Sequence, residues 1–176
     1  MTHSLPTRMQ LLVIRHGIAE EAETFATSGL DDSRRPLTKP GKRKMKEVAA
    51  GLREIVETID VIGASPLLRA QQTAEIVAKA YGDLPVDTVQ ALSPESDPSA
   101  LVGWLEQHES AKGVAIVGHE PHLGKLVSWL MTGVRDSRVA MSKGGAALLE
   151  LSSPVTASGG TLEWLLTASQ LRRIGK

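Results

Sequence analysis

The sequence predicts a three-layer α/β/α fold in which a mainly parallel central sheet lies between two layers of helices. Two observations predict this class. Short apolar runs alternate along the chain with segments of helical periodicity, an order typical of strand–helix–strand units. The chain has 176 residues, of which 41% are hydrophobic and 23% charged, so it can bury one sizeable core. We therefore expect a single domain over residues 1–176.

Strands are predicted wherever a short apolar run is bounded by turn residues. The predicted strands are residues 11–14, 61–64, 86–92, 114–117, 146–151 and 161–167. The run at 86–92 is the weakest of the set. The last two runs are joined across Ser158, Gly159 and Gly160, and we expect them to pair as a terminal hairpin.

Helices are predicted between these strands. From Lys42 onward, apolar residues recur at helical spacing and define one face: Met45, Val48, Ala49, Leu52, Ile55, Val56 and Ile59. Ser65 followed by Pro66 predicts an N-cap hydroxyl and a proline at the first helical position, in a helix that runs to about residue 80. Two more helices are expected, a short one at 101–108 and one whose apolar face runs from Leu123 to Met131.

A long polar segment, residues 17–40, separates the first strand from the first of these helices. It contains glycine, proline and several acidic residues. Compact domains rarely carry a loop of this length unless it covers or builds a site. We therefore expect this segment to shape access to a functional site.

Composition excludes several classes of function. Twenty basic and twenty acidic residues give a formal net charge of zero, so nothing draws the whole chain to nucleic acid or to an anionic membrane. The absence of cysteine excludes disulfides, thiolate catalysis and cysteine-ligated zinc. No apolar run approaches the length of a signal-peptide core or a membrane span, which predicts a cytoplasmic protein.

Basic side chains follow three of the predicted strands. Arg15 and His16 come directly after the first strand, Arg69 follows the strand at 61–64, and His119 follows Gly118 after the strand at 114–117. Ligands of open α/β sheets bind at the carboxyl ends of the strands, so these four residues are expected to converge. Because the grouped cations repel one another, the pocket requires a dense anion, and phosphate matches the donors of arginine best.

Histidine adds chemistry to this binding site. A neutral imidazole is a competent nucleophile, and neighbouring cations favour the neutral form, so His16 is predicted to attack phosphorus in line. Gly17 lacks a side chain and is expected to let substrate and backbone approach closely. His119, once protonated, would stabilise the transferring oxygens together with Arg15 and Arg69. The resulting hypothesis is phosphoryl transfer through a phosphohistidine, without a metal.

Four ordered motifs resemble a known family. They are RHG at 15–17, RPLTKPG at 35–41, SPLLRAQQTAE at 65–75 and GHEP at 118–121. Together they resemble the histidine phosphatase superfamily, also called phosphoglycerate mutase-like. The short chain, with no large insertion after the third motif, is most similar to the SixA-like phosphohistidine phosphatase branch. The resemblance implies a phosphoglycerate mutase-like fold and no cofactor.

The same resemblance implies roles for individual residues. His16 would accept the phosphoryl group, while Arg15, Arg69 and His119 would form the phosphate pocket. The RPLT segment would add Arg35 and Thr38.

Many members of the superfamily also use a carboxylate to protonate an alcohol leaving group. In this chain Glu95 is the best candidate for that proton donor, with Asp97 behind it, although Pro94, Asp97 and Pro98 are also typical of a turn and a helix start. Phosphohistidine has an activated P–N bond and an imidazole that can depart neutral, so it depends less on such an acid. A weak acid therefore favours a phosphohistidine-bearing protein as substrate and partner.

Alternative functions remain open at this point. One is a phosphatase for small phosphomonoesters; a mutase is less favoured because mutases usually carry longer chains. A second is a metal site, because His119 and His122 are three residues apart, but a third ligand at convincing spacing is missing. The last is a non-catalytic module that binds phosphate or docks a partner.

Overall fold

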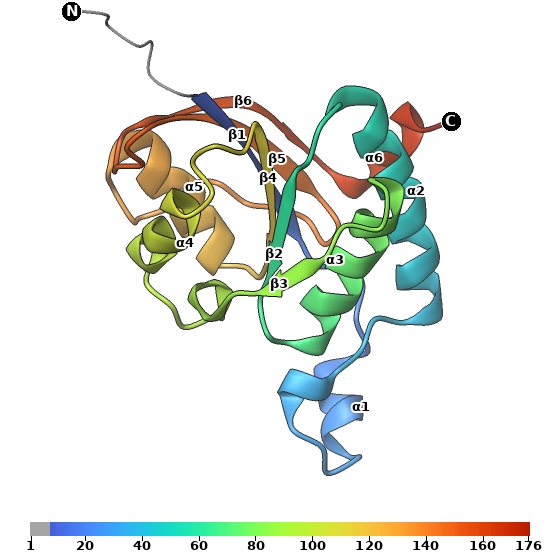
Figure 1. The fold of residues 1–176 in the computed structure, drawn as a ribbon. Helices are drawn as coiled ribbons and strands as arrows, with labels where there is room; N and C mark the ends of the chain where they lie inside the picture. Colours follow the sequence, from blue (N-terminus) through green and yellow to red (C-terminus); the bar gives the residue numbers. More distant parts are fainter. Residues whose placement is uncertain (1–7) are drawn as a thin grey trace, which may run out of the picture.

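A six-stranded sheet forms the centre of the molecule (Figure 1). The computed structural model describes residues 8–176, and its strands follow the order β3-β2-β4-β1-β5-β6. Their bounds are β1 Arg8–Arg15, β2 Val61–Ala64, β3 Val86–Thr88, β4 Gly113–Gly118, β5 Ala146–Ser152 and β6 Gly160–Leu166. The first four strands in this order are parallel, β5 is antiparallel to β1, and β6 is antiparallel to β5. The sheet is therefore mixed but mainly parallel, as predicted.

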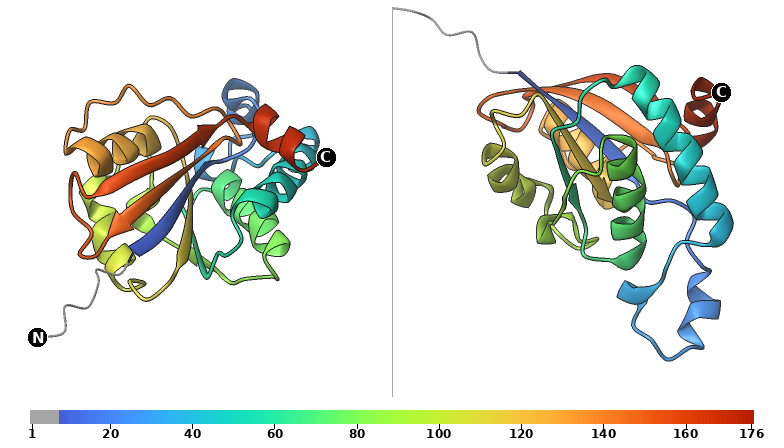
Figure 2. Two further views of the ribbon diagram at one scale, coloured as in Figure 1. Left: turned by 90° about the horizontal axis from the view of Figure 1, so that it is seen from above. Right: turned by 45° about the vertical axis from the view of Figure 1, so that its right-hand side comes forward.

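Helices cover both faces of this sheet, which confirms the three predicted layers. The α-helices are α1 Ala22–Ala26, α2 Lys39–Ile55, α3 Leu68–Ala80, α4 Val102–Glu106, α5 His122–Thr132 and α6 Ala168–Ile174. Short 3₁₀ helices are η1 Asp32–Arg34, η2 Gln90–Leu92 and η3 Pro98–Leu101. Helices α2, α3 and α6 pack on one face and α4 and α5 on the other (Figures 1 and 2). No helix within residues 8–176 combines the length and apolar character needed to cross a bilayer.

Strand β1 shows how the two helical layers share the sheet. Side chains alternate along a strand, so Leu11 and Val13 pack toward α5 while Leu12 and Ile14 pack toward α2 and α3. All four are fully or almost fully buried. Because both faces are covered, the strand has to be apolar at consecutive positions, and this explains why it forms a continuous apolar run in the sequence.

The register of three neighbouring strands defines the functional edge of the sheet. Strand β4 lies between β1 and β2, and Val117 pairs with Ile14 on one side and with Ala64 on the other. All three strands are parallel, so they end at the same level. The residues that follow each strand therefore emerge side by side at one edge.

Helix α2 begins earlier than predicted. Thr38 is its N-cap, with Oγ1 accepting a hydrogen bond from the Gly41 amide at 2.9 Å, so the helix starts at Lys39 rather than Lys42. At the other end Ile55 is exposed, against the prediction, because the helix stops there. Val56 and Ile59 are buried as predicted, but from the segment beyond the helix.

The prediction for the start of α3 was wrong. The helix begins at Leu68, and its N-cap residue, Leu67, contributes no side-chain hydrogen bond. Ser65 and Pro66 lie before the helix, and the Ser65 hydroxyl instead has a partner in the segment after β4, described below. The predicted end at about residue 80 is confirmed.

Several element boundaries differ in smaller ways. The predicted strand at 86–92 is divided into β3 and η2, and the predicted helix at 101–108 into η3 and α4. The hairpin of β5 and β6 is confirmed, with a longer connection, residues 153–159, than the turn that was predicted. Helices α1 and α6 were missed. Helix α6 does have a local signal, a capping box in which Thr167 and Gln170 bond each other's backbone amides.

The polar segment after β1 is more ordered than a simple loop. A bridge between Ala19 and Leu37 closes its base, and between these residues lie α1 and η1. Figure 1 shows this segment projecting beyond the carboxyl edge of the sheet. It is therefore placed beside the residues that follow β1, β2 and β4.

Candidate active site

His16 lies directly after β1 and is held by its neighbours on both sides. Its amide donates a hydrogen bond to the Gly118 carbonyl at 3.0 Å, which extends the β1–β4 pairing by one residue. Its ring nitrogen Nδ1 lies 2.7 Å from the Gly17 carbonyl oxygen. A carbonyl can only accept, so Nδ1 carries the proton and Nε2 keeps a lone pair. This is the tautomer that a nucleophilic imidazole needs at Nε2.

Gly17 is small for a reason that the sequence did not reveal. A Cβ atom at this position would lie 2.6 Å from Cγ of Met45, a buried residue of α2. The glycine thus allows the segment after β1 to approach α2. Close approach of substrate to the Gly17 backbone stays a prediction. Its amide donates to Oγ1 of Thr73 at 3.0 Å, and the Thr73 hydroxyl donates to the Arg69 carbonyl at 2.8 Å. Thr73 was not predicted as a site residue from the sequence. Its hydroxyl holds the backbone of Gly17, the residue whose carbonyl orients the His16 ring.

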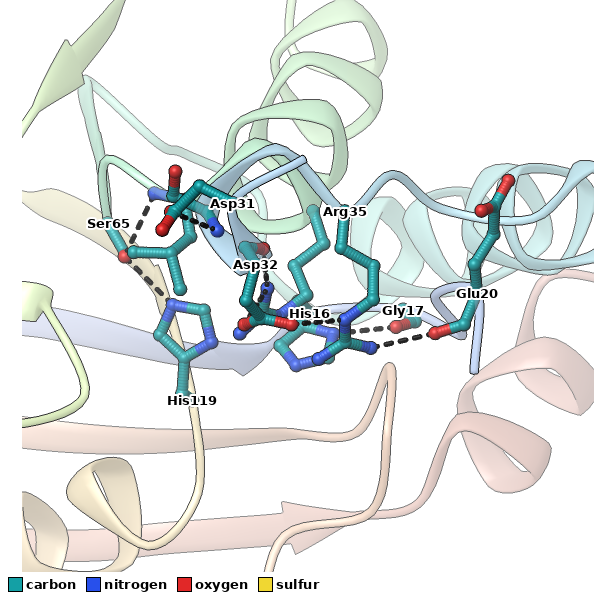
Figure 3. A network of polar contacts seen from close by, with 11 residues as sticks. His16, Gly17, Glu20, Asp31, Asp32, Arg35, Ser65 and His119 are labelled. Atoms are coloured by element: carbon teal, nitrogen blue, oxygen red, sulfur yellow. Dashed lines mark hydrogen bonds and ion pairs between the residues drawn. The ribbon is translucent and has the colours of Figure 1, made fainter. Parts of the chain in front are cut away.

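His119 lies after β4 and faces His16. The two imidazole centroids are 5.1 Å apart, and both residues are buried. His119 Nε2 lies 2.8 Å from the Ser65 hydroxyl oxygen, which also accepts the Leu67 amide at 3.3 Å (Figure 3). Ser65 was predicted as a helix cap. Instead it positions His119, and its place directly after β2 was the signal that could have indicated this.

Arg15 and Arg69 use the same terminal nitrogen of the guanidinium group for a hydrogen bond to the protein. Arg15 donates from one terminal nitrogen to the Met141 carbonyl at 2.8 Å, and Arg69 donates from the equivalent nitrogen to the Asp32 carbonyl at 3.1 Å. Within residues 8–176, the buried Nε atom of each arginine has no hydrogen-bond partner. The side edge of each guanidinium, Nε with the other terminal nitrogen, is the edge that binds two oxygens of a phosphate at once.

Both histidines are held in the neutral form. Burial, followed by the positive charges of Arg69, Arg15 and Arg35, lowers the pKa of His16 to about 4, although its bond to the Gly17 carbonyl acts in the opposite direction. Burial, followed by His16 and Arg69, lowers the pKa of His119 to about 3. At neutral pH the free protein therefore has an uncharged imidazole pair beside arginine charges. A bound phosphate dianion would oppose this shift and favour protonation of His119.

Arg35 and Thr38, predicted from the RPLT segment, have different surroundings. Arg35 lies close enough to His16 to lower its pKa, and it donates to Asp32 Oδ1 at 2.7 Å and to the Glu20 carbonyl at 2.8 Å. Thr38 uses its hydroxyl as the N-cap of α2. A capping role therefore accounts for Thr38, whereas Arg35 lies among the charges around His16.

The two carboxylates considered as proton donors are both exposed. Glu95 lies in the turn before η3, and within residues 8–176 its side chain makes no hydrogen bond or ion pair. Asp97 caps η3 through the Ser99 amide and pairs with both Nε and a terminal nitrogen of Arg135. The bonds from Arg135 and Ser99 hold the pKa of Asp97 well below its usual range, which makes it a poor proton donor.

His122, which together with His119 suggested a metal site in the sequence, and Glu120, which lies between the two histidines in the chain, have separate environments. His122 is the first residue of α5 and is buried, and burial lowers its pKa. Glu120 accepts the Gly124 amide at 2.7 Å and so binds the first turn of the helix. Among the described residues, no group of three or more His, Asp or Glu side chains is arranged to hold a metal ion. The arrangement therefore supplies no third ligand to the histidine pair.

Comparison with known proteins identifies the family. Residues 11–94 match the family described as the histidine phosphatase superfamily (branch 1). The chain is 30% identical over 133 residues to the phosphohistidine phosphatase SixA homolog of Haemophilus influenzae, which covers 69% of this chain and 77% of the relative. The chain belongs to the histidine phosphatase superfamily. It is an enzyme of the histidine phosphatase type.

Solved structures of this superfamily share the fold. A structure of the protein histidine phosphatase SixA complexed with tungstate superposes with a TM-score of 0.78 at 28% identity, covering 93% of this chain and 99% of that one. Phosphoglycerate mutase from Bacillus anthracis superposes with a TM-score of 0.69 at 12% identity, covering 97% and 98%. The predicted phosphoglycerate mutase-like fold is thereby confirmed.

The neutral state of His16 leads to a testable pH dependence. An ordinary histidine, with a pKa of about 6.5, is mostly protonated at about pH 5.5. His16, whose pKa is lowered to about 4, should remain neutral there and take up a proton only as the pH falls toward about 4. An NMR titration of the imidazole protons, with the His16 signal assigned by its loss in His16→Ala, measures this. A midpoint near the ordinary value would contradict the environment described above.

Proposed function

We propose that this enzyme removes phosphoryl groups in two steps through a phosphorylated His16, and that its substrate is a protein-bound phosphohistidine. One observation carries the proposal. His16 has Nδ1 bonded to a carbonyl and Nε2 free, in a buried position beside His119 and the unpaired side edges of two arginines. A nucleophile and an oxyanion-binding group are thus combined in one pocket.

In the first step, Nε2 of His16 attacks phosphorus. The N–P bond to His16 forms while the bond from phosphorus to the leaving group breaks in line. Arg15 and Arg69 bind the non-bridging oxygens through their side edges, and His119 donates a hydrogen bond to them once it is protonated. In the second step water attacks phosphorus, inorganic phosphate leaves, and His16 returns to its neutral form. No step of this route is assigned to a metal or cofactor.

The choice of phosphohistidine rests on the leaving group. An alkoxide leaves poorly unless an acid protonates it, and Glu95 is exposed, with nothing among residues 8–176 to hold its carboxylate in place. A phosphohistidine whose second ring nitrogen is protonated releases neutral imidazole and requires no such acid. The names of the relatives agree with this choice, since both the Haemophilus protein and the tungstate complex are described as histidine phosphatases of the SixA type.

Substrate competition tests this proposal. Hydrolysis of a carrier protein phosphorylated on histidine would be compared with hydrolysis of a panel of small phosphomonoesters, each with and without a chelator. We expect kcat/KM for the phosphohistidine protein to exceed that for the alkyl esters by at least about 100-fold, because only the esters need a placed acid. A preference for small esters would assign the enzyme to phosphomonoesters instead. Loss of activity with the chelator would contradict the metal-independent route.

A further inference from the structure

Asp32, an acidic residue that no motif suggested, contacts two of the arginines around His16. Its Oδ1 accepts Nε of Arg35 at 2.7 Å, and its Oδ2 lies 3.2 Å from a terminal nitrogen of Arg69. The same nitrogen of Arg69 donates to the backbone carbonyl of Asp32 at 3.1 Å. Figure 3 shows the hydrogen bond between the Asp32 carboxylate and Arg35. One residue of η1 therefore links both guanidinium groups.

The atoms that Asp32 uses leave the phosphate-binding edge of Arg69 available. Asp32 occupies one terminal nitrogen, while the buried Nε has no partner within the described residues. A guanidinium is planar and rigid, so a contact at one nitrogen sets the direction of the opposite edge. Arg15 has the same arrangement, with the Met141 carbonyl in the place of Asp32. In each of these arginines, one terminal nitrogen is thus bonded to a protein oxygen, on the side away from the edge that would bind phosphate.

Asp32 differs from the other groups of the pocket in its exposure. Its side chain is 56% exposed, whereas that of Arg69 is 7% exposed. It also lies in the projecting segment between β1 and α2, with no sheet or long helix to hold it. Asp31, its neighbour, uses its carboxylate only to cap η1 through the Ser33 amide at 2.9 Å. Two adjacent exposed aspartates thus have distinct roles, and within residues 8–176 it is the Asp32 carboxylate that contacts Arg35 and Arg69.

We propose that Asp32 is a positioning residue that holds Arg69 in the orientation in which its side edge binds the phosphoryl group, while Arg35 holds the Asp32 carboxylate in place through Oδ1. This proposal rests on the proposed function, because it concerns the same pocket. It also gives η1 a role beside the site, because this segment supplies the oxygen atoms against which Arg69 is aligned. Removal of the carboxylate would leave this nitrogen of Arg69 with the Asp32 backbone carbonyl alone, so the guanidinium could rotate about that one contact. A misalignment of about 1 Å costs up to about 100-fold in rate.

Two other roles for Asp32 predict different results. Bonds from Arg35 and the charge of Arg69 lower the pKa of Asp32, so its carboxylate is ionised at neutral pH and is unsuited to donate a proton. A purely electrostatic role would make Asp32 inhibitory, because a negative charge beside an anion site opposes anion binding. Positioning and repulsion therefore predict opposite signs for the effect of removing the charge.

The experiment measures tungstate binding by calorimetry, and turnover of an aryl phosphate and of an alkyl phosphate, whose leaving group is poorer. The variants are Asp32→Ala, Asp32→Asn and the matched control Asp31→Asn. We expect Asp32→Ala to weaken tungstate binding and to lower kcat/KM, each by about 10-fold or more. Asp32→Asn keeps one acceptor oxygen and should lose less. Asp31→Asn should equal the wild type, and all three variants should keep the wild-type melting temperature.

Several outcomes would overturn the proposal. Tighter tungstate binding in Asp32→Ala would show that the carboxylate opposes the anion. Losses as large in Asp32→Asn as in Asp32→Ala, confined to esters with poor leaving groups, would assign Asp32 to proton donation. Equal losses in Asp31→Asn would indicate a general effect of η1. The binding arm does not depend on turnover, so a wild type that binds tungstate but hydrolyses neither the ester nor a protein-bound phosphohistidine would refute the proposed function alone.

Discussion

Replacing His16 with alanine is expected to abolish turnover while the protein still binds oxyanions. The imidazole keeps a lone pair on Nε2 because its Nδ1 is bonded to the Gly17 carbonyl, whereas His119 Nε2 is engaged with Ser65. Loss of a catalytic nucleophile costs about 10³-fold or more in kcat. Steady-state hydrolysis of an aryl phosphate measures the loss. Quenching with alkaline detergent, in which the P–N bond is stable, should trap a phosphoenzyme from radiolabelled substrate in the wild type and none in His16→Ala.

The control for this variant is tungstate binding. Arg15, Arg69 and His119 remain in His16→Ala, so the pocket should still bind tungstate within about 10-fold of the wild-type affinity. A variant that binds tungstate but does not turn over has lost chemistry and kept its fold. Turnover equal to the wild type would exclude His16 as the nucleophile and with it the two-step route.

Replacing Arg69 with alanine is expected to have the second largest effect. Arg69 is buried and presents the edge formed by Nε and one terminal nitrogen to the pocket. Its replacement by alanine removes two hydrogen-bond donors and one positive charge from the transferring oxygens. Loss of such stabilisation costs about 10²-fold to 10³-fold in rate. Both tungstate affinity and kcat should fall. Arg69→Lys should recover only part of the loss, because an ammonium cannot bind two oxygens in the same fork.

Arg34 provides the matched control for Arg69. It lies on η1, close in sequence to Asp32, but its side chain is exposed and makes no hydrogen bond or ion pair within residues 8–176. Arg34→Ala removes the same formal charge from the same region. Activity in this variant should remain close to the wild type. If Arg34→Ala lost as much as Arg69→Ala, long-range charge would explain both effects and the guanidinium edge would not.

The sequence predicted the layers of the fold because its signals are local. Each buried strand must be apolar at consecutive positions, and each helix must repeat its apolar face about every 3.6 residues, so both patterns can be recognised without knowing what they pack against. The run at 11–14 indicated β1 for this reason. The ends of the helices were predicted less accurately, because the repeat of apolar residues does not show where a helix stops. Ile55 continues the apolar pattern of α2 in the sequence, but it is the last residue of the helix and is exposed.

Ser65 shows why local signals were insufficient at the site. A serine before a proline is a good helix cap by local criteria, and the sequence contains nothing to show that His119, 54 positions away, would compete for its hydroxyl. Gly17 and Met45 are a similar pair, since the need for a glycine arises from a helix that packs on it from another part of the chain. In both cases the chemical type of the residue was evident, but its partner was not.

The sequence by itself determined which groups are present for phosphoryl chemistry: two histidines and three arginines in four ordered motifs, with no cysteine. The tertiary structure decided how these groups act. It bonds Nδ1 of His16 to a carbonyl so that Nε2 keeps its lone pair, and within residues 8–176 it leaves Nε of Arg69 without a partner. It also places Asp32 in contact with Arg69, which lies 37 positions away in the chain. The physical reason is that a hydrogen bond depends on distance and direction in space, and these arise only when the parallel strands align and the segments after them meet at one edge.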